Sequence, residues 1–348
     1  MSELTLAQAH EWVEKVLLHC GASPAMAAAT ARSLVRAEAQ GIASHGLSRV
    51  PQYATHLKNG RANGQAVPEV ARRKGSAMLV DAHQGLAFEA CELAVREAVA
   101  VAREHGVCFV GVSNSHHCGV LVDHLRPVAE AGMVGLGFAN SPSAMPVAGG
   151  RHAILGTNPI AAIFPRQGHG PLMIDLSLSE VARGKLMVAA KEGREIPLGW
   201  AVDAQGHPTN DPAVLSQTPP GTLLPVGGLT HGHKGFGLAL LVESLTAGLA
   251  GRGRADPKEG WGATVHMTLY HIDSFSGQTE FLRQMDHVAR MCRTNRPVDS
   301  NRPVRMPGDQ GLRRFKEQSQ HGIVLHPSIW PQLEPLSQKL GLPLPHPL

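Results

Sequence analysis

Residues 86–119 read LAFEACELAVREAVAVAREHGVCFVGVSNSHHCG, and this stretch decides the fold class. Apolar residues recur at helical spacing up to Gly106, and glycine is the residue type that commonly ends a helix. The apolar run VCFVGVSNS (107–115) follows at once and is typical of a buried strand. A helix that leads directly into a buried strand predicts a mixed α/β fold.

The flanking sequence predicts a helical beginning and an alternating remainder. The first 60 residues predict three helices, with start signals at Thr5, Ser23 and Ser44 and a third helix that runs to Gly60. Residues 203–222 have the composition of a loop. Further strands are predicted at 133–141, 159–165, 172–178 and 265–273, and further helices near 120–131, 182–192, 235–250 and 278–293.

Composition and charge exclude several classes of protein. The 348 residues carry a formal net charge of only +4 and no long Lys/Arg run, which gives a nucleic-acid or membrane-surface partner little support. No apolar stretch reaches the roughly 18 residues of a membrane span, and the N-terminus lacks a signal-peptide pattern. The five cysteines form no CxxC pair, which favours the reducing cytoplasm over a disulfide framework.

The segment SHGLSRVPQY (44–53) carries side chains suited to a small acid. If Ser44 begins a helix, His45, Arg49 and Tyr53 recur every four residues and share one face. An arginine can hold a carboxylate through two hydrogen bonds, and a nearby histidine can transfer a proton near neutral pH. A solvated amphipathic face is the alternative, and Pro51 weakens the helix that this spacing needs.

The segment SNSHHCG (113–119) places two adjacent imidazoles at the end of a predicted strand. On an extended strand His116 and His117 point to opposite faces, and Cys118 completes no CxxC or HxxxH spacing, so we expect no metal site. A lone catalytic histidine fits better, since α/β sheets bind ligands at the carboxyl ends of strands. Packing of the imidazoles is the alternative.

A glycine-rich turn precedes the apolar segment at 227–251, GGLTHGHKGFGLALLVESLTAGLAG. Free backbone N–H groups at a helix start, together with Lys234, would form an anion site for a cofactor phosphate, and a solvated loop is an equal alternative. No GxGxxG occurs in the chain, which disfavours a standard Rossmann dinucleotide site. The residues alone therefore indicate an α/β enzyme that handles a small acid.

Together these motifs resemble the non-Rossmann malate/L-lactate dehydrogenase family. That family also includes sulfolactate and ureidoglycolate dehydrogenases, a diketogulonate reductase and reductases of cyclic imino acids. The matching stretches follow the family's order and span most of residues 1–310. They are SHGLSRVPQY (44–53), NSHHCG (114–119), GFANSPSAMPVAGG (137–150), ILGTNPIAAIFP (154–165), LMIDLSLSEVARGKLMVAAKEGREIP (172–197), HKGFGLALLVESLTAGLAG (233–251) and RMPGDQ (305–310).

The resemblance implies a homodimeric oxidoreductase that uses NADH or NADPH. It implies an unusual mixed sheet in a cofactor-binding domain at residues 75–289. A helical N-terminal unit at residues 1–74 would be joined by the C-terminal segment 290–348.

The resemblance also implies roles for individual residues. His45 and His117 match the family's two histidines, one of which is the acid/base, and the family does not settle which. Arg49 would orient the substrate carboxylate, with Ser44 and Tyr53 close by. No metal is implied. Cofactor contacts would fall on Ser141, Asp175, Leu176, Ser177, His233, Lys234, Gly308 and Asp309.

Two departures from the family's pattern affect these expectations. The residues LTHG (229–232) are an apparent insertion before Lys234, which would reshape the loop around the phosphates or leave it disordered. PGD (307–309) stands where the family often has PGE, which is a mild change. The C-terminal segment matches the family poorly.

The leading hypothesis is an NAD(P)-dependent dehydrogenase of small 2-hydroxy acids such as malate, lactate or sulfolactate. A proton would move between the substrate oxygen and a histidine, so reduction and oxidation should show opposite pH trends. The alternative is a reductase of cyclic imino acids, Δ1-piperideine-2-carboxylate or Δ1-pyrroline-2-carboxylate. A histidine-rich metal-binding or assembly protein is a third hypothesis from another class.

Overall fold

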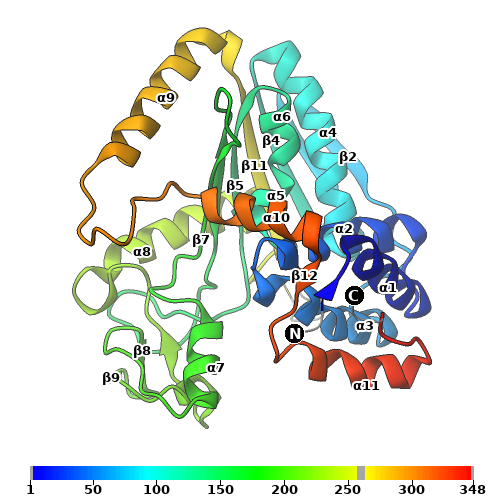
Figure 1. The fold of residues 1–348 in the computed structure, drawn as a ribbon, viewed down its shortest axis with the longest axis vertical. Helices are drawn as coiled ribbons and strands as arrows, with labels where there is room; N and C mark the ends of the chain where they lie inside the picture. The colour runs from blue at the N-terminus through cyan, green and yellow to red at the C-terminus, as the bar shows by residue number, and fades with distance from the viewer. Residues whose placement is uncertain (1–2, 257–262, 346–348) are drawn as a thin grey trace.

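A seven-stranded mixed sheet forms the centre of the computed structural model, which describes residues 3–256 and 263–345 (Figure 1). Its strand order is β2-β3-β4-β11-β5-β6-β7, and β3 and β4 run parallel whereas the other neighbouring pairs are antiparallel. The predicted mixed α/β class is confirmed. The strands are β2 Glu69–Lys74, β3 Ala77–Asp81, β4 Val107–Ser115, β5 Met133–Ala139, β6 Ile160–Phe164, β7 Leu172–Leu176 and β11 Ala263–His271.

Helix α4 (Ala87–His105) connects the two parallel strands and packs on the sheet. Small residues such as Ala94 and Ala98 line its buried stripe, and they belong to the same buried cluster as Val110 and Val112 of β4. The helix ends at Gly106, which adopts a left-handed conformation with φ of +83°. The long helix and the strand predicted from residues 86–115 are therefore confirmed.

Two short helices cover the same face of the sheet beside α4. The helix predicted near 120–131 is divided into α5 (Leu121–His124) and α6 (Arg126–Glu130), and Pro127 lies in the first turn of α6. Proline has no N–H to continue a preceding helix, which accounts for the break. Gly135 and Gly137 on β5 allow these helices to lie close to the sheet.

The N-terminal helices and the end of the chain share a second core (Figure 1). Its members come from α1 (Leu6–His19), α2 (Pro24–Ala39) and α3 (Val50–Lys58), and also from β12 (Ile323–Val324) and α11 (Trp330–Leu340). Strand β1 (Glu3–Leu4) pairs with β12, and α10 (Asp309–His321) packs on α2. The predicted division into a helical unit (1–74 with 290–348) and a cofactor-binding domain (75–289) stays a prediction.

The third predicted helix is wrong at its start. Ser44 does not cap it, because residues Ala43–His45 and Leu47–Arg49 form two 3-10 turns and α3 begins at Val50. Pro51 in the first turn of α3 explains this start, since a proline is tolerated there and not further inside a helix. His45, Arg49 and Tyr53 therefore do not share one helical face.

A third group of elements forms the lower left lobe in Figure 1. The segment 203–222, predicted as a loop, contains one short strand, a 3-10 turn at Val214–Ser216 and the first residue of another strand. The lobe comprises α7 (Arg183–Lys191), β8 (Ala201–Val202), β9 (Pro208–Thr209), β10 (Thr222–Leu223) and α8 (Gly228–Glu243), which continues as a π-helical turn at Ser244–Gly248. Outside this lobe, helix α9 (Gln278–Thr294) lies at the upper left of the sheet in Figure 1.

The glycine-rich segment predicted before residue 235 does turn, at Gly227 and Gly228, whose φ values of +99° and +55° are left-handed. Helix α8 is counted from Gly228 and includes the apparent insertion 229–232, but it is not regular over these residues. The helix is kinked at His231, whose φ of −126° is not helical. The regular part of α8 therefore starts after His231, and Lys234 lies in its first turn. The anion site predicted there stays a prediction.

No helix in the described part of the chain is long and apolar enough to cross a membrane. All five cysteines are free thiols, and four of them are buried.

Replacing Gly106 by alanine should lower the free energy of unfolding by about 1–2 kcal/mol, the cost of a left-handed residue with a side chain. The added Cβ would also lie 2.9 Å from Ser274 Oγ. Gly60→Ala is the matched control, because its φ is +73° and no atom lies within 4 Å of the added Cβ. In urea titrations Gly106→Ala should lose more stability than Gly60→Ala, and an unchanged midpoint would contradict this account.

Candidate active site

Helix α3 and the end of β4 meet at a tyrosine–histidine contact. Tyr53 Oη lies 2.6 Å from His117 Nδ1, and the Tyr53 side chain is fully buried. The backbone N–H of Gly119 also donates to His117 Nδ1, at 3.1 Å. An N–H can only donate, so Nδ1 carries no proton and the Tyr53 hydroxyl donates to it. A neutral His117 therefore holds its proton on Nε2.

The two 3-10 turns bring His45 and Arg49 to the same place. The His45 and His117 rings stack with centroids 5.5 Å apart, and Ser44 Oγ lies 2.9 Å from His45 Nδ1. Arg49 Nε donates to the Ser44 carbonyl at 2.6 Å, and one terminal nitrogen donates to Gln52 Oε1 at 2.9 Å. The five residues that the resemblance implies for catalysis thus lie together, through the turns rather than through one helix.

A buried carboxyl group on α2 holds these turns in place. Glu38 Oε2 accepts a hydrogen bond from the backbone N–H of Leu47 at 2.8 Å. A Cβ at Gly46 would lie only 2.2 Å from the same oxygen, so this close approach requires glycine. The path that carries His45 and Arg49 therefore depends on a residue from another helix.

Burial keeps the imidazoles of the site neutral. It lowers the pKa of His45 to about 4 and that of His117 well below its ordinary value, and the charge of Arg49 lowers both further. Part of His45 still contacts solvent. Arg49 is thus the permanent positive charge in this group of residues, and a carboxylate bound to it would offset its effect on both histidines.

The sequence reasoning missed a second hydrogen-bonded pair beside His117. His56 Nδ1 lies 2.6 Å from His116 Nε2, and their side chains are 8% and 1% exposed. Tyr53 and His56 are separated by one turn of α3, and their partners are adjacent in the chain. His56 follows Tyr53 at the i+3 spacing, which was the available signal. Within residues 3–256 and 263–345, no cluster of His, Cys, Asp or Glu is arranged to hold a metal ion.

Two of the implied cofactor segments meet next to residues 116–119, the loop that carries His116 and His117. Asp175 near the end of β7 accepts a hydrogen bond from Val122 N–H at 2.9 Å, three residues beyond Gly119. Protein around this partly exposed carboxyl desolvates it and raises its pKa to about 6. The Met173 N–H, also on β7, donates to the Pro307 carbonyl, so Gly308 lies beside this strand. Leu176 and Ser177 follow Asp175 directly.

Asp309 lies between two arginines at the start of α10. Its carboxylate accepts hydrogen bonds from Arg166 at 3.1 Å and from Arg293 at 2.9 Å, and these guanidinium groups lower its pKa although desolvation opposes them. This carboxylate thus ties α10 to the β6–β7 connection and to α9. The two guanidinium groups leave the surroundings of Asp309 with a net positive charge, which suits a phosphate.

The remaining implied cofactor residues lie around α8. Ser141 N–H donates to Asn158 Oδ1 at 3.2 Å, and Asn158 in turn donates to Glu243 of α8. His233 and Lys234 are exposed on this helix. A carboxyl group, exposed cations and a helix start are chemically suited to the ribose and phosphates of a dinucleotide.

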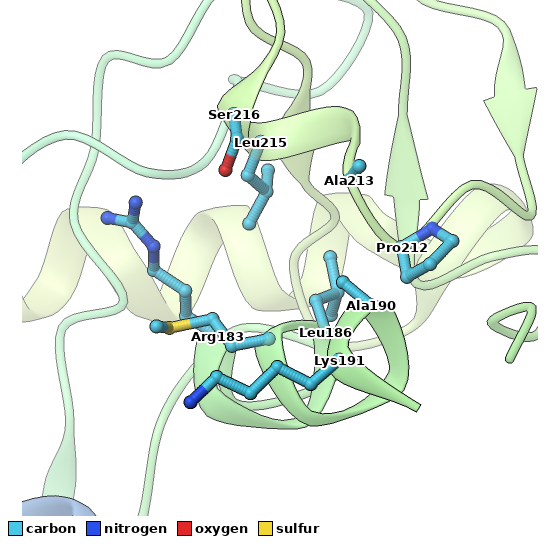
Figure 2. A pocket seen from close by; sticks show the side chains of 9 residues that line it. Arg183, Leu186, Ala190, Lys191, Pro212, Ala213, Leu215 and Ser216 are labelled. Carbon is cyan, nitrogen blue, oxygen red and sulfur yellow. The ribbon is translucent and has the colours of Figure 1, made fainter. Parts of the chain in front are cut away.

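A separate cavity of about 210 Å³ lies between α7 and the 3-10 turn Val214–Ser216. Figure 2 shows Arg183 and Lys191 extending from α7 beside apolar side chains that include Leu186 and Leu215. None of the residues predicted for the site lines this cavity. The converging histidines therefore define the candidate active site.

A family model described as malate/L-lactate dehydrogenase matches residues 4–334. The chain belongs to this family. Its members use NAD(H) or NADP(H), so the protein is an NAD(P)-dependent oxidoreductase, and the resemblance drawn from the motifs is confirmed.

Relatives in this family act on two kinds of substrate. The chain is 49% identical over 224 residues, 64% of both chains, to a (2R)-3-sulfolactate dehydrogenase (NADP(+)) of Chromohalobacter salexigens. It is 34% identical over 93% of both chains to a Δ1-pyrroline-2-carboxylate/Δ1-piperideine-2-carboxylate reductase of Pseudomonas syringae pv. tomato. The solved sulfolactate dehydrogenase of Methanocaldococcus jannaschii matches with a TM-score of 0.87, 29% identity and 98% of each chain.

Below pH 6.5 the stability of the fold should decline, because unfolded histidines take up protons that the folded chain excludes. The pKa of His116 is lowered by burial to about 3 in the folded chain. The stability that neutral His116 allows is therefore fully present above pH 6.5. Between pH 6.5 and pH 3 the free energy of unfolding falls on its account by up to about 1.4 kcal/mol per pH unit. His116→Gln removes this titration, so its urea midpoint should fall less than that of the wild type between pH 7 and 5. Parallel declines would contradict the assignment.

Proposed function

We propose that the protein transfers a hydride between NAD(P)H and a small 2-oxo or 2-hydroxy acid, with a sulfolactate-like acid as the first candidate. The observation that carries this proposal is the convergence of Arg49, His45 and His117 around one place, in a chain of this family. The 49% identity with a sulfolactate dehydrogenase supports the ranking of candidates.

Arg49 binds the carboxylate of the acid in this proposal. Two of its nitrogens are held by Ser44 and Gln52, which fixes the direction of the guanidinium group before the acid arrives. A bound carboxylate neutralises Arg49, so the pKa values of His45 and His117 rise when the substrate binds. Substrate binding thus helps to create the proton donor that reduction needs.

His45 or His117 exchanges the proton of the substrate oxygen. The Tyr53 and Gly119 hydrogen bonds leave the Nε2 of His117 as its proton-bearing atom. The Ser44 hydroxyl contacts Nδ1 of His45, which leaves the Nε2 of that ring for the acid in the same way. The proposal assigns the acid/base role to this pair and leaves the choice between them to the variants below.

The bound nicotinamide cofactor supplies or accepts the hydride. We propose that the cofactor is held on the β7 side, next to residues 116–119, by Asp175, Leu176, Ser177, Gly308 and Asp309. Ser141, His233 and Lys234 would hold its other part along α8.

A reductase of cyclic imino acids is the second candidate. The relative that supports it is aligned over 93% of the chain, more than the sulfolactate dehydrogenase, although at 34% identity. Such a substrate also carries a carboxylate for Arg49, and a C=N bond replaces the C=O bond.

The purified protein should oxidise NADPH or NADH in the presence of one of these substrates. We would test 3-sulfopyruvate, oxaloacetate, pyruvate, Δ1-piperideine-2-carboxylate and Δ1-pyrroline-2-carboxylate with each cofactor, and follow the absorbance at about 340 nm, where the reduced cofactor absorbs. Highest kcat/KM with a 2-oxo acid supports the leading proposal, and highest kcat/KM with an imine selects the second. If the protein turns over none of the five compounds, both proposals are contradicted.

Replacing His45 or His117 singly by asparagine should lower kcat by about 100-fold or more for the residue that transfers the proton. In the wild type, kcat/KM for reduction should fall as pH rises, and kcat/KM for oxidation should rise, because the two directions need the protonated and the neutral imidazole. His19→Asn, at an exposed position of α1, is the control. Full activity in both site variants would remove the acid/base assignment.

We also propose that two copies of the chain form a homodimer that covers part of α8. Leu238, Leu240 and Leu241 are 40–46% exposed on this helix, and an exposed apolar patch of this kind is typical of a protein interface. Light scattering after size-exclusion chromatography should give twice the 36.9 kDa chain mass. The double variant Leu240→Glu and Leu241→Glu should give a folded single chain by circular dichroism. A wild-type monomer would contradict the proposal.

A further inference from the structure

One turn of α3 contacts two consecutive residues after β4. Tyr53 donates to His117, and His56, three residues later on the same helix, is hydrogen-bonded to His116. The backbone N–H of His116 also donates to the Gly85 carbonyl at 3.0 Å, just before α4. The peptide that carries His117 is therefore tied at the preceding residue to two other elements.

The His56–His116 bond lies in the interior and is made between neutral rings. Burial lowers the pKa of both imidazoles, that of His116 to about 3, so neither is protonated near neutral pH. A neutral imidazole has one N–H, and a bond between two such rings therefore requires one nitrogen to donate and the other to accept. Whichever nitrogen donates, the tautomer of one ring then determines the tautomer of the other. The bond also orients both rings.

We propose that His56 and His116 form a positioning pair that fixes His117 for proton transfer, although neither touches the substrate. The inference rests on the proposed function, because it assigns the pair to a reaction at His117. The Tyr53 and Gly119 bonds hold the ring of His117 at Nδ1, and the His56–His116 bond holds the residue before it. Because Tyr53 and His56 lie on the same turn of α3, the two side-chain bonds together fix the position of His117 relative to this helix.

Four variants separate the hydrogen bond from the volume of the ring. His56→Leu and His116→Leu remove the bond and retain an apolar side chain of moderate size. His56→Asn keeps a polar atom near the Nδ1 position, and His116→Gln keeps one near the Nε2 position. His19→Leu, at an exposed position of α1, is the matched control for replacing a histidine by leucine.

Each leucine variant should lower kcat about tenfold, the size of effect expected for one misplaced hydrogen-bonded group, while KM for cofactor and acid changes less than threefold. The two conservative variants should recover most of kcat. The double variant with both leucines should lose no more than either single variant, because both remove the same bond. Thermal melts show whether each variant is folded.

Equal kcat in the wild type and both leucine variants would overturn the proposal, and so would conservative variants as slow as the leucine ones. If the loss of kcat in the double leucine variant equals the product of the two single losses, the two residues act separately.

A readout without turnover keeps this inference distinct from the proposed function. Two-bond ¹⁵N–¹H spectra of protein labelled in its histidines report which ring nitrogen carries the proton. The wild type should show His117, assigned by the loss of its signal in His117→Asn, protonated on Nε2. His56→Leu should broaden or shift that signal, whereas His56→Asn should restore it. An unchanged His117 signal in folded His56→Leu overturns the positioning role even if no substrate is found.

Discussion

The contact between helix α3 and His116 and His117, which directly follow strand β4, is the one on which the site depends. Tyr53 is fully buried and reaches His117 across this contact, while the turns just before α3 carry His45 and Arg49 to the same point. The geometry of the reacting groups is thus set where the helical N-terminal part meets the sheet. A shift of α3 relative to these two histidines would therefore disturb the Tyr53 contact and the turns that precede the helix.

Removal of water from this contact has an electrostatic effect as well as a structural one. Protonation of a buried imidazole costs its hydration, so His45 and His117 stay neutral beside the guanidinium of Arg49. An anion that binds there gains the attraction of Arg49 without competing with a carboxylate of the protein, since the hydrogen bonds of Arg49 go to a carbonyl and an amide. In the proposed reaction, these features favour an acid over a neutral substrate.

Local patterns in the sequence predicted the elements well and their arrangement poorly. The helix and strand of residues 86–115 follow from hydrophobic spacing and from one glycine, and both are confirmed. The turns at 43–49 could not be foreseen, because Glu38 of another helix holds them through Leu47. The convergence of His45 with His117 was implied only by the family resemblance. The partner of His116 had no local signal beyond a histidine one turn after Tyr53.

The position of β11 has a consequence for the synthesis of the chain. This strand lies between β4 and β5, yet it is encoded at Ala263–His271, more than 120 residues after the end of β5. While the ribosome extends the chain through those residues, the inner edges of β4 and β5 lack the neighbour that pairs with both. Late closure of a sheet centre exposes strand edges to association with other nascent chains, which is the condition that chaperones relieve.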